Sequence, residues 1–289
     1  MEKTILTNKK PARIEAKKAI QNMMMYTREK IGENSFDKDL FEIKSINVEI
    51  NNLNPVFNDY KIINLSDIHL GQWINKEYLD GVIEIVNNEN PDLITLTGDY
   101  VSYNIDDVKD DLRDCLKNLN AKDGVLSVLG NHDHWLGAKT IKNVLKNAEI
   151  KNLSNDVHII NKNEEKLYIA GLDSVTVGKN NLNKVLNKIP DNCAAILLVH
   201  EPDIADLISK TNKFSLQISG HSHGGQFIIP GTKNAIFRGE YSKKYPVGEY
   251  KIGNMIQYTS KGLGTNNFWF RINCPPEITI FHLKTKKED

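Results

Sequence analysis

Apolar runs of four to six residues alternate with amphipathic segments from about residue 60 onward. Continuous apolar runs of this length are typical of strands that are buried on both faces. They lie at 61–65, 92–97, 124–129, 167–170, 194–199 and 216–219. Apolar residues at helical spacing fill 79–86, 108–119 and 141–148 between them. This alternation predicts an α/β domain in which helices cover a mixed or parallel sheet.

After residue 224 the pattern changes to short strand-like runs that are separated by turn residues. The runs lie at 227–229, 248–252, 255–259 and 278–283. Pro230-Gly231 and Gly253-Asn254 are typical turn pairs, which join neighbouring strands closely. We therefore predict an antiparallel, meander-like section at the end of the chain.

Residues 1–40 differ from the rest because they are rich in lysine and arginine. A helix over 12–30 would place Ile20, Met23 and Met24 on one face and basic side chains on another. Such a helix either packs on the domain that follows or rests on a membrane surface, giving peripheral membrane contact through residues 1–40. We expect residues 1–45 to form a basic helical extension and residues 46–289 to form one domain.

Composition narrows the classes of partner and compartment. The 37 basic and 37 acidic residues give a formal net charge of zero, which disfavours bulk attraction to nucleic acid. Cys115, Cys193 and Cys274 are widely spaced and form no disulfide pattern and no C-x-x-C pair. The sequence has no run of 18 apolar residues and no apolar signal core. We therefore expect a cytoplasmic protein, with membrane association through the extension as the alternative.

Histidine, aspartate and asparagine gather directly after five of the predicted strands. The segments are 66–69, 98–99, 130–133, 199–200 and 220–223. Because the carboxyl ends of strands in α/β sheets meet at one crevice, residues far apart in sequence can converge there. In Asp67-Ile68-His69 and His221-Ser222-His223, the alternating residues face a common side.

Each segment also has a plain structural explanation. An Asp-x-His pair at a strand end is commonly a capping pair, and Gly-Asp is commonly a turn. A single histidine such as His200 commonly lies near the core with its ring nitrogens hydrogen-bonded to protein groups. The order of all five, each after an apolar run, instead favours a metal site. Mixed nitrogen and oxygen ligands suit manganese, iron or zinc rather than an all-oxygen calcium site.

The ordered segments resemble the motifs of the calcineurin-like metallophosphoesterase family over about residues 61–225. Within the family the chain is most similar to the bacterial and archaeal branch that includes YkuE-type phosphodiesterases. The similarity to this branch lies in 198–203, 223–226, 262–265 and 275–278, and in Arg271. The resemblance implies a four-layer α/β/β/α sandwich with two mixed β-sheets, in which residues 46–289 are the catalytic domain.

The resemblance also implies two divalent metal ions, manganese, iron or zinc, and it assigns their ligands. Asp67, His69 and His223 would hold the first ion; Asn131, His200 and His221 would hold the second; Asp99 would bridge both.

His132 would not be a ligand by this resemblance. It would steady the transition state or protonate the leaving alkoxide. Many relatives carry an acidic residue three positions after the bridging aspartate, where this chain has Ser102. Asp133 is an alternative group that would orient His132.

The activity implied is hydrolysis of a phosphodiester or pyrophosphate bond by a hydroxide that bridges the two metals. A lipid-linked or nucleotide-linked phosphoester is the substrate favoured, with a phosphomonoester, a nucleic acid or a cyclic nucleotide as alternatives. A non-catalytic scaffold is disfavoured because all seven ligand positions carry competent residues. Arg271 would either bind a substrate phosphate or pair with Glu277. Nothing in the sequence indicates the oligomeric state.

Overall fold

The computed structural model describes residues 36–71, 73–229, 239–265 and 270–286, together with Met23, Thr27 and Lys30. The chain divides into two compact units, Met1–Asp37 and Lys38–Asp289. The predicted helix over 12–30 lies almost wholly outside the described residues, so the basic extension stays a prediction. None of the helices in the described part of the chain has the length and apolar character needed to span a bilayer.

One six-stranded sheet of the larger unit has the order β1-β12-β2-β3-β4-β5. Its strands are β1 (Glu42–Ile50), β2 (Lys61–Leu65), β3 (Leu93–Leu96), β4 (Val125–Ser127), β5 (Lys151–Asn152) and β12 (Glu277–Thr285). Neighbours run parallel except β12 and β2, which run antiparallel with Ile280 opposite Ile63. The parallel strands β2, β3 and β4 therefore end at the same edge of the sheet.

The second six-stranded sheet has the order β10-β11-β9-β8-β7-β6. Its strands are β6 (Asp156–Lys162), β7 (Glu165–Gly171), β8 (Ala194–Leu198), β9 (Leu216–Ser219), β10 (Gly248–Ile252) and β11 (Met255–Thr259). The four inner strands run parallel, while β6 and β10 are antiparallel edge strands joined by hairpins to β7 and β11. Both sheets are therefore mixed.

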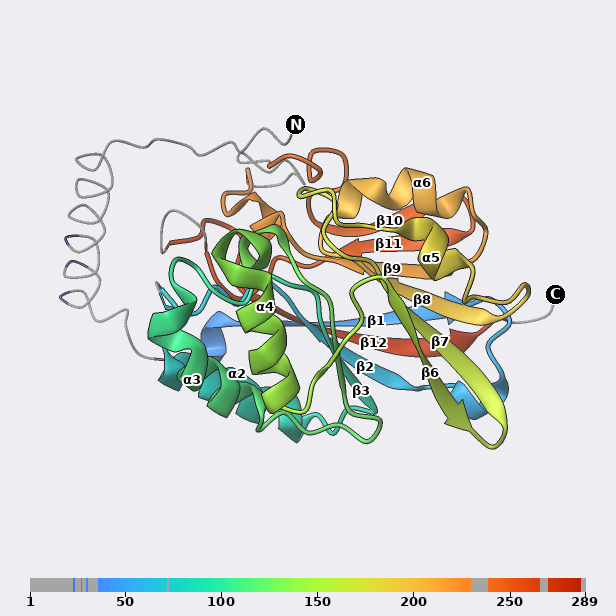
Figure 1. The fold of residues 1–289 in the computed structure, drawn as a ribbon, viewed down its shortest axis with the longest axis horizontal. Helices are drawn as coiled ribbons and strands as arrows, with labels where there is room; N and C mark the ends of the chain where they lie inside the picture. Colours follow the sequence, from blue (N-terminus) through green and yellow to red (C-terminus); the bar gives the residue numbers. More distant parts are fainter. Residues whose placement is uncertain are drawn as a thin grey trace. The chain divides into compact units, whose positions relative to one another are not determined.

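The two sheets stack with helices outside them (Figure 1). The helices α2 (Lys76–Asn88), α3 (Ile105–Leu116) and α4 (Asn131–Asn147) cover the first sheet; α5 (Leu182–Leu186) and α6 (Ala205–Ser209) cover the second. Short 3-10 helices lie at Lys38–Leu40, Pro55–Phe57, Pro202–Ile204 and His223–Gly225. The predicted four-layer α/β/β/α sandwich with two mixed sheets is confirmed.

An apolar core between the sheets fixes their relative position. Alternate strand residues gather in it, among them Ile62, Leu93, Leu126, Ile169, Ile196 and Ile218. The intervening residues of the first sheet, such as Ile63 and Ile94, are also buried, on the other face. On the second sheet, Val185 and Ile208 from the covering helices pack with Leu197. Burial on both faces explains why these strands are continuous apolar runs in the sequence.

The six strands predicted before residue 220 are present, with ends that differ by at most two residues. The meander predicted after residue 224 is wrong in part. β10 and β11 form the expected hairpin, but β11 joins β9 in parallel and β12 crosses to the first sheet. β12 is buried on both faces along most of its length, which suits a central strand and not the edge of a meander.

Phe281 provides a test of the core between the sheets. It lies on β12, is fully buried, and packs edge-on against Tyr258 of the second sheet, with 5.3 Å between ring centroids. Phe281→Ala should lower the free energy of unfolding by about 3–5 kcal/mol, because apolar burial is lost and a cavity is left. Urea unfolding measures this, with Leu207→Ala at an exposed position of α6 as the control. A loss below about 1 kcal/mol would contradict the assigned core.

Candidate metal centre

The candidate ligands lie where strands of both sheets end. β2 leads to Asp67 and His69, β3 to Asp99, β4 to Asn131, β8 to His200, and β9 to His221 and His223. Neither sheet supplies the whole set, so the stacking of the two sheets is what assembles it.

Five of these residues have a backbone conformation that is uncommon outside glycine. Their φ angles lie between 49° and 70°, in the left-handed region. They are Asp67, His69, Asp99, His221 and His223. Strain of this kind persists only where surrounding contacts fix it, and it is concentrated at functional sites. The sharp turns at the strand ends therefore help to position the candidate ligands.

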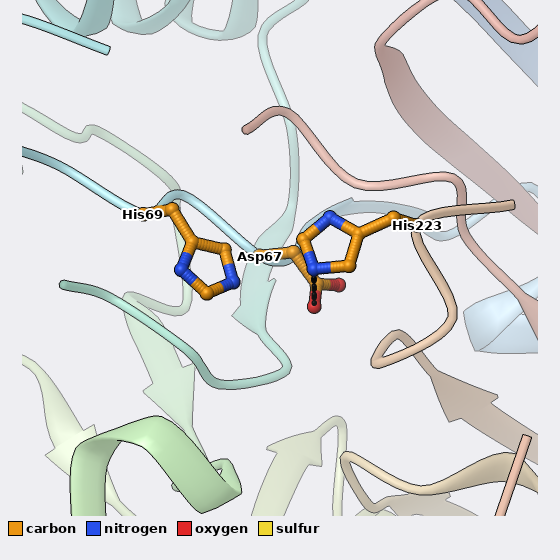
Figure 2. A group of neighbouring side chains, drawn as sticks. All are labelled: Asp67, His69 and His223. Atoms are coloured by element: carbon orange, nitrogen blue, oxygen red, sulfur yellow. Dashed lines mark ion pairs between the residues drawn. The ribbon is translucent and has the colours of Figure 1, made fainter. Parts of the chain in front are cut away.

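Ligand atoms of the described histidine, cysteine and acidic residues gather in three clusters, with each cluster's atoms within 4.8 Å of one another. The clusters are Asp67, His69 and His223; His69, Asp99 and His132; and Asp99, His200 and His221. Because they share His69 and Asp99, they form one continuous group. Figure 2 shows the first cluster, where the His223 ring stands against the Asp67 carboxylate. The structure thus brings together six of the seven predicted ligands and His132.

Asn131, the seventh predicted ligand, begins α4 directly before His132. Its Oδ1 atom is buried and has no hydrogen-bond partner among the described residues. The Nε2 atoms of His69 and His200 are in the same state. Because a buried polar atom without a partner costs about 1–3 kcal/mol, native structures normally satisfy such atoms. Two nitrogens and one oxygen of this kind fit a site for divalent cations.

Backbone carbonyls determine which ring nitrogen of three histidines faces the cluster. The pairs are His200 Nδ1 with Thr97 O at 2.7 Å, His223 Nδ1 with Gly264 O at 3.1 Å, and His221 Nε2 with Glu240 O at 2.7 Å. Since a carbonyl only accepts, these nitrogens carry the proton and the opposite nitrogen keeps its lone pair. Metal-binding histidines in proteins usually donate their other ring N–H to a carbonyl or carboxylate in this way, which fixes the orientation of the ring.

Three ring nitrogens lie close to carboxylate oxygens. His200 Nε2 lies 3.1 Å from Asp99 Oδ2. His69 Nε2 lies 3.6 Å from the same oxygen, and His223 Nε2 lies 3.5 Å from Asp67 Oδ1. Two acceptors at such distances repel each other unless a proton or a metal ion lies between them. The donor set and its geometry therefore fit a cation.

Burial and charge set the protonation of these groups. Burial lowers the pKa of His69 and of His223 to about 3, which keeps both rings neutral. Burial alone would raise the pKa of Asp99, but the adjacent His200 outweighs it and holds that pKa well below its usual value. Against burial, Asp99 in turn raises the pKa of His200. The neutral rings of His69 and His223 are in the form that binds a metal ion, whereas His200 would release a proton when an ion binds.

Asp133 does not orient His132, which was the alternative that the sequence left open. Its buried carboxylate accepts three backbone N–H groups, from Asp99 and Tyr100 at 2.9 Å and from Gly130 at 2.8 Å. Burial and the neighbouring Asp99 raise the pKa of Asp133 to about 7. Asp133 therefore ties the start of α4 to the turn that carries Asp99.

A serine hydroxyl and a backbone N–H hold the Asp67 carboxylate, in roles that the sequence did not predict. The Ser66 hydroxyl donates to Asp67 Oδ2 at 2.6 Å, and the His221 backbone N–H donates to the same atom at 3.0 Å. A Cβ on Gly220 would lie 1.8 Å from Ser66 Oγ and 2.3 Å from Asp67 Oδ2. Glycine at 220 therefore allows the second sheet to approach the Asp67 carboxylate directly.

Ser102 and Glu201 stabilise the segments next to two ligands. The Ser102 hydroxyl donates to the His69 carbonyl at 2.8 Å. Glu201 directly follows His200, is fully buried, and accepts the Ser174 hydroxyl at 2.5 Å and two backbone N–H groups of the same loop. This role of Glu201 was not predicted from the sequence, although a carboxylate stands directly after a candidate ligand there.

A model of the calcineurin-like phosphoesterase family matches residues 60–225, which is more than half of the chain and includes all seven candidate ligands. The chain belongs to the calcineurin-like phosphoesterase family. This membership confirms the resemblance found in the sequence, and it makes the chain a metal-dependent phosphoester hydrolase by family.

Relatives in this family cover most of the chain. The Bacillus subtilis metallophosphoesterase YkuE is 35% identical over 233 residues, covering 79% of this chain and 80% of its own length. Cj0846 of Campylobacter jejuni is 33% identical over 258 residues, covering 85% of this chain. The chain spans 64% of that protein. The Escherichia coli phosphodiesterase YaeI is 28% identical, covering 78% of this chain and 82% of its own length.

Asp133→Asn should destabilise the metal-free chain by about 2–4 kcal/mol, because the new amide turns a donor toward buried N–H groups. Urea unfolding in the presence of a chelator measures this effect. Asp107→Asn, on the exposed face of α3, is the matched control and should change stability by no more than about 0.5 kcal/mol. An equally small effect of Asp133→Asn would show that the carboxylate does not hold the Asp99 turn.

Proposed function

We propose that the chain hydrolyses a phosphodiester or pyrophosphate bond with two divalent metal ions held by the candidate ligands. The observation that carries the proposal is the group of clusters joined through His69 and Asp99. One ion would take Asp67, His69 and His223, the other Asn131, His200 and His221, with Asp99 shared.

When bound, the two ions would activate a water molecule as the nucleophile and draw charge from the phosphate oxygens. The chain would supply position and rigidity, because its ligands stand at the ends of strands packed in one core. A phosphate held in a fixed orientation reacts faster, since much of the entropy cost of alignment is met on binding. Manganese, iron and zinc all suit the nitrogen and oxygen donors.

His132 is the residue that we assign to the leaving group. Its backbone N–H donates to Asp99 Oδ1 at 2.9 Å, and its ring packs edge-on against His69 with 4.8 Å between centroids. The Trp135 ring lies 5.0 Å away on α4. The His132 side chain is half-buried, so a substrate oxygen can approach it. From there His132 would donate a proton to the departing alkoxide or stabilise its charge.

A phosphodiester is favoured because one relative, YaeI, is named a phosphodiesterase. The metal ions would bind the phosphate and not its substituents. The metal ligands therefore do not distinguish a lipid-linked from a nucleotide-linked ester. Phosphomonoesters, cyclic nucleotides and nucleic acids are the competing substrates, and the zero net charge disfavours the last. The cytoplasmic location and the membrane contact through residues 1–40 stay predictions.

Asp99→Asn and His132→Gln should separate metal binding from proton transfer. With an aryl phosphodiester, His132→Gln should lower kcat by about 10²–10⁴-fold and keep its metal, because a general acid is lost. Asp99→Asn should lose both activity and bound metal, because the shared ligand is weakened. Metal content by mass spectrometry and initial rates with added Mn²⁺ measure the two effects.

His158→Gln on β6 is the matched control and should leave rate and metal content unchanged, since His158 pairs with Lys151. Undiminished hydrolysis by His132→Gln would remove its assigned role. Hydrolysis by the wild-type chain that survives complete chelation would contradict the metal-dependent mechanism. A panel that adds an aryl monoester and a nucleotide sugar identifies the class of bond cleaved.

A further inference from the structure

Arg271 plays neither of the roles that the sequence suggested for it. The Glu277 carboxylate accepts the hydroxyls of Tyr258 and Thr279 at 2.9 and 2.7 Å, and Arg271 has no ion pair with any carboxylate in the described part of the chain. Both terminal nitrogens of its guanidinium donate to backbone carbonyls, so they do not face a substrate phosphate.

The guanidinium joins two segments that are distant in sequence. Nη2 donates to the carbonyls of Lys261 at 2.9 Å, Gly262 at 3.2 Å and Gly264; Nη1 donates to those of His223 and Cys274, each at 3.3 Å. A planar fork can serve several carbonyls at fixed angles, whereas an ammonium group cannot reproduce that geometry. Arg271 therefore ties the segment 261–264 to the turn at His223.

The segment 261–264 packs directly against the turn that carries Asp67 and His69. The Gly264 backbone N–H donates to the Asp67 carbonyl at 2.7 Å. A Cβ on Gly262 would lie 2.7 Å from Asp67 Cβ, and one on Gly264 would lie 2.4 Å from the Ile68 carbonyl oxygen. A displacement of this segment would therefore move the ligands.

The Gly264 carbonyl is the point where the two sets of contacts meet. It accepts from Arg271 Nη2 and also from His223 Nδ1. The bond from His223 orients its ring so that Nε2 faces Asp67 Oδ1 at 3.5 Å. Groups that orient a metal-binding histidine in this way contribute to the affinity for the metal.

We propose that Arg271 is a positioning residue for one of the two metal sites. Its fork holds the Gly264 carbonyl in place, and that carbonyl orients His223 toward Asp67 and His69. The proposal rests on the proposed metal ligation. It names one site of the two, because Arg271 donates to the carbonyls of His223 and of the segment beside Asp67, and none of its hydrogen bonds in the described part of the chain goes to His200 or His221.

The test measures binding of Mn²⁺ alone to the full chain, by calorimetry and by electron paramagnetic resonance. Arg271→Lys keeps the charge and removes the fork, and Arg113→Lys on α3, where the side chain pairs with Asp110, is the matched control. The wild type and the control should bind two ions. Arg271→Lys should bind one of them about 10–100-fold more weakly and leave the other unchanged.

A double-variant cycle with His223→Ala tests the route of the effect. If Arg271 acts through His223, adding Arg271→Lys to His223→Ala should cost no further affinity at that site. Unchanged binding at both sites in Arg271→Lys would overturn the proposal, as would additive losses in the cycle. Equal weakening of both sites, with lower stability of the metal-free chain in urea, would overturn it in favour of a general structural role. A wild-type chain that binds no Mn²⁺ would instead refute the proposed function, independently of Arg271.

Discussion

Asp99 is buried at the end of β3, where Oδ2 lies 3.1 Å from His200 Nε2 and 3.6 Å from His69 Nε2. A carboxylate among ring nitrogens in a low-dielectric interior is costly unless positive charge balances it. The surroundings of Asp99 add to the cost, because the carboxylate of Asp133 is held against the same turn. The fold therefore maintains an arrangement that becomes favourable when a proton or a metal ion lies between these atoms, and many contacts hold the Asp99 turn in place to keep it.

The distances in the site depend on the packing between the sheets. Asp67 and Asp99 stand on the first sheet, while His200 and His223 stand on the second, so the distances from His200 to Asp99 and from His223 to Asp67 span the two. Close-packed interiors transmit displacement, and a metal site tolerates ligand errors of only about 0.5 Å. The geometry of the site thus depends on the core that contains Ile62 and Ile196. Gly220 also contributes, because any side chain at this position would push the two sheets apart beside Asp67.

The sequence predicted what is local or periodic. The strands 61–65 and 216–219 were found to the residue, because burial on both faces makes them continuous apolar runs. β1 was missed, although Ile46, Val48 and Ile50 alternate as a half-buried strand does. The sheet to which β12 belongs was not predictable. An apolar run indicates that a strand is buried, but it does not indicate with which strands it pairs. The partners of Asp133 and Arg271 are backbone groups, which leave no trace in side-chain patterns.

The charge of the proposed site accounts for what it would recognise. Two divalent ions would carry four positive charges, of which the ligand carboxylates of Asp67 and Asp99 would balance two, while the histidine ligands and Asn131 would add no charge once the ions are bound. Arg271 adds a further positive charge and has no carboxylate partner in the described residues. A site with this excess would attract a phosphate anion, whatever the alcohol of the ester. Discrimination between esters then depends on the groups around the leaving atom, where His132 and the exposed ring of Trp135 lie side by side.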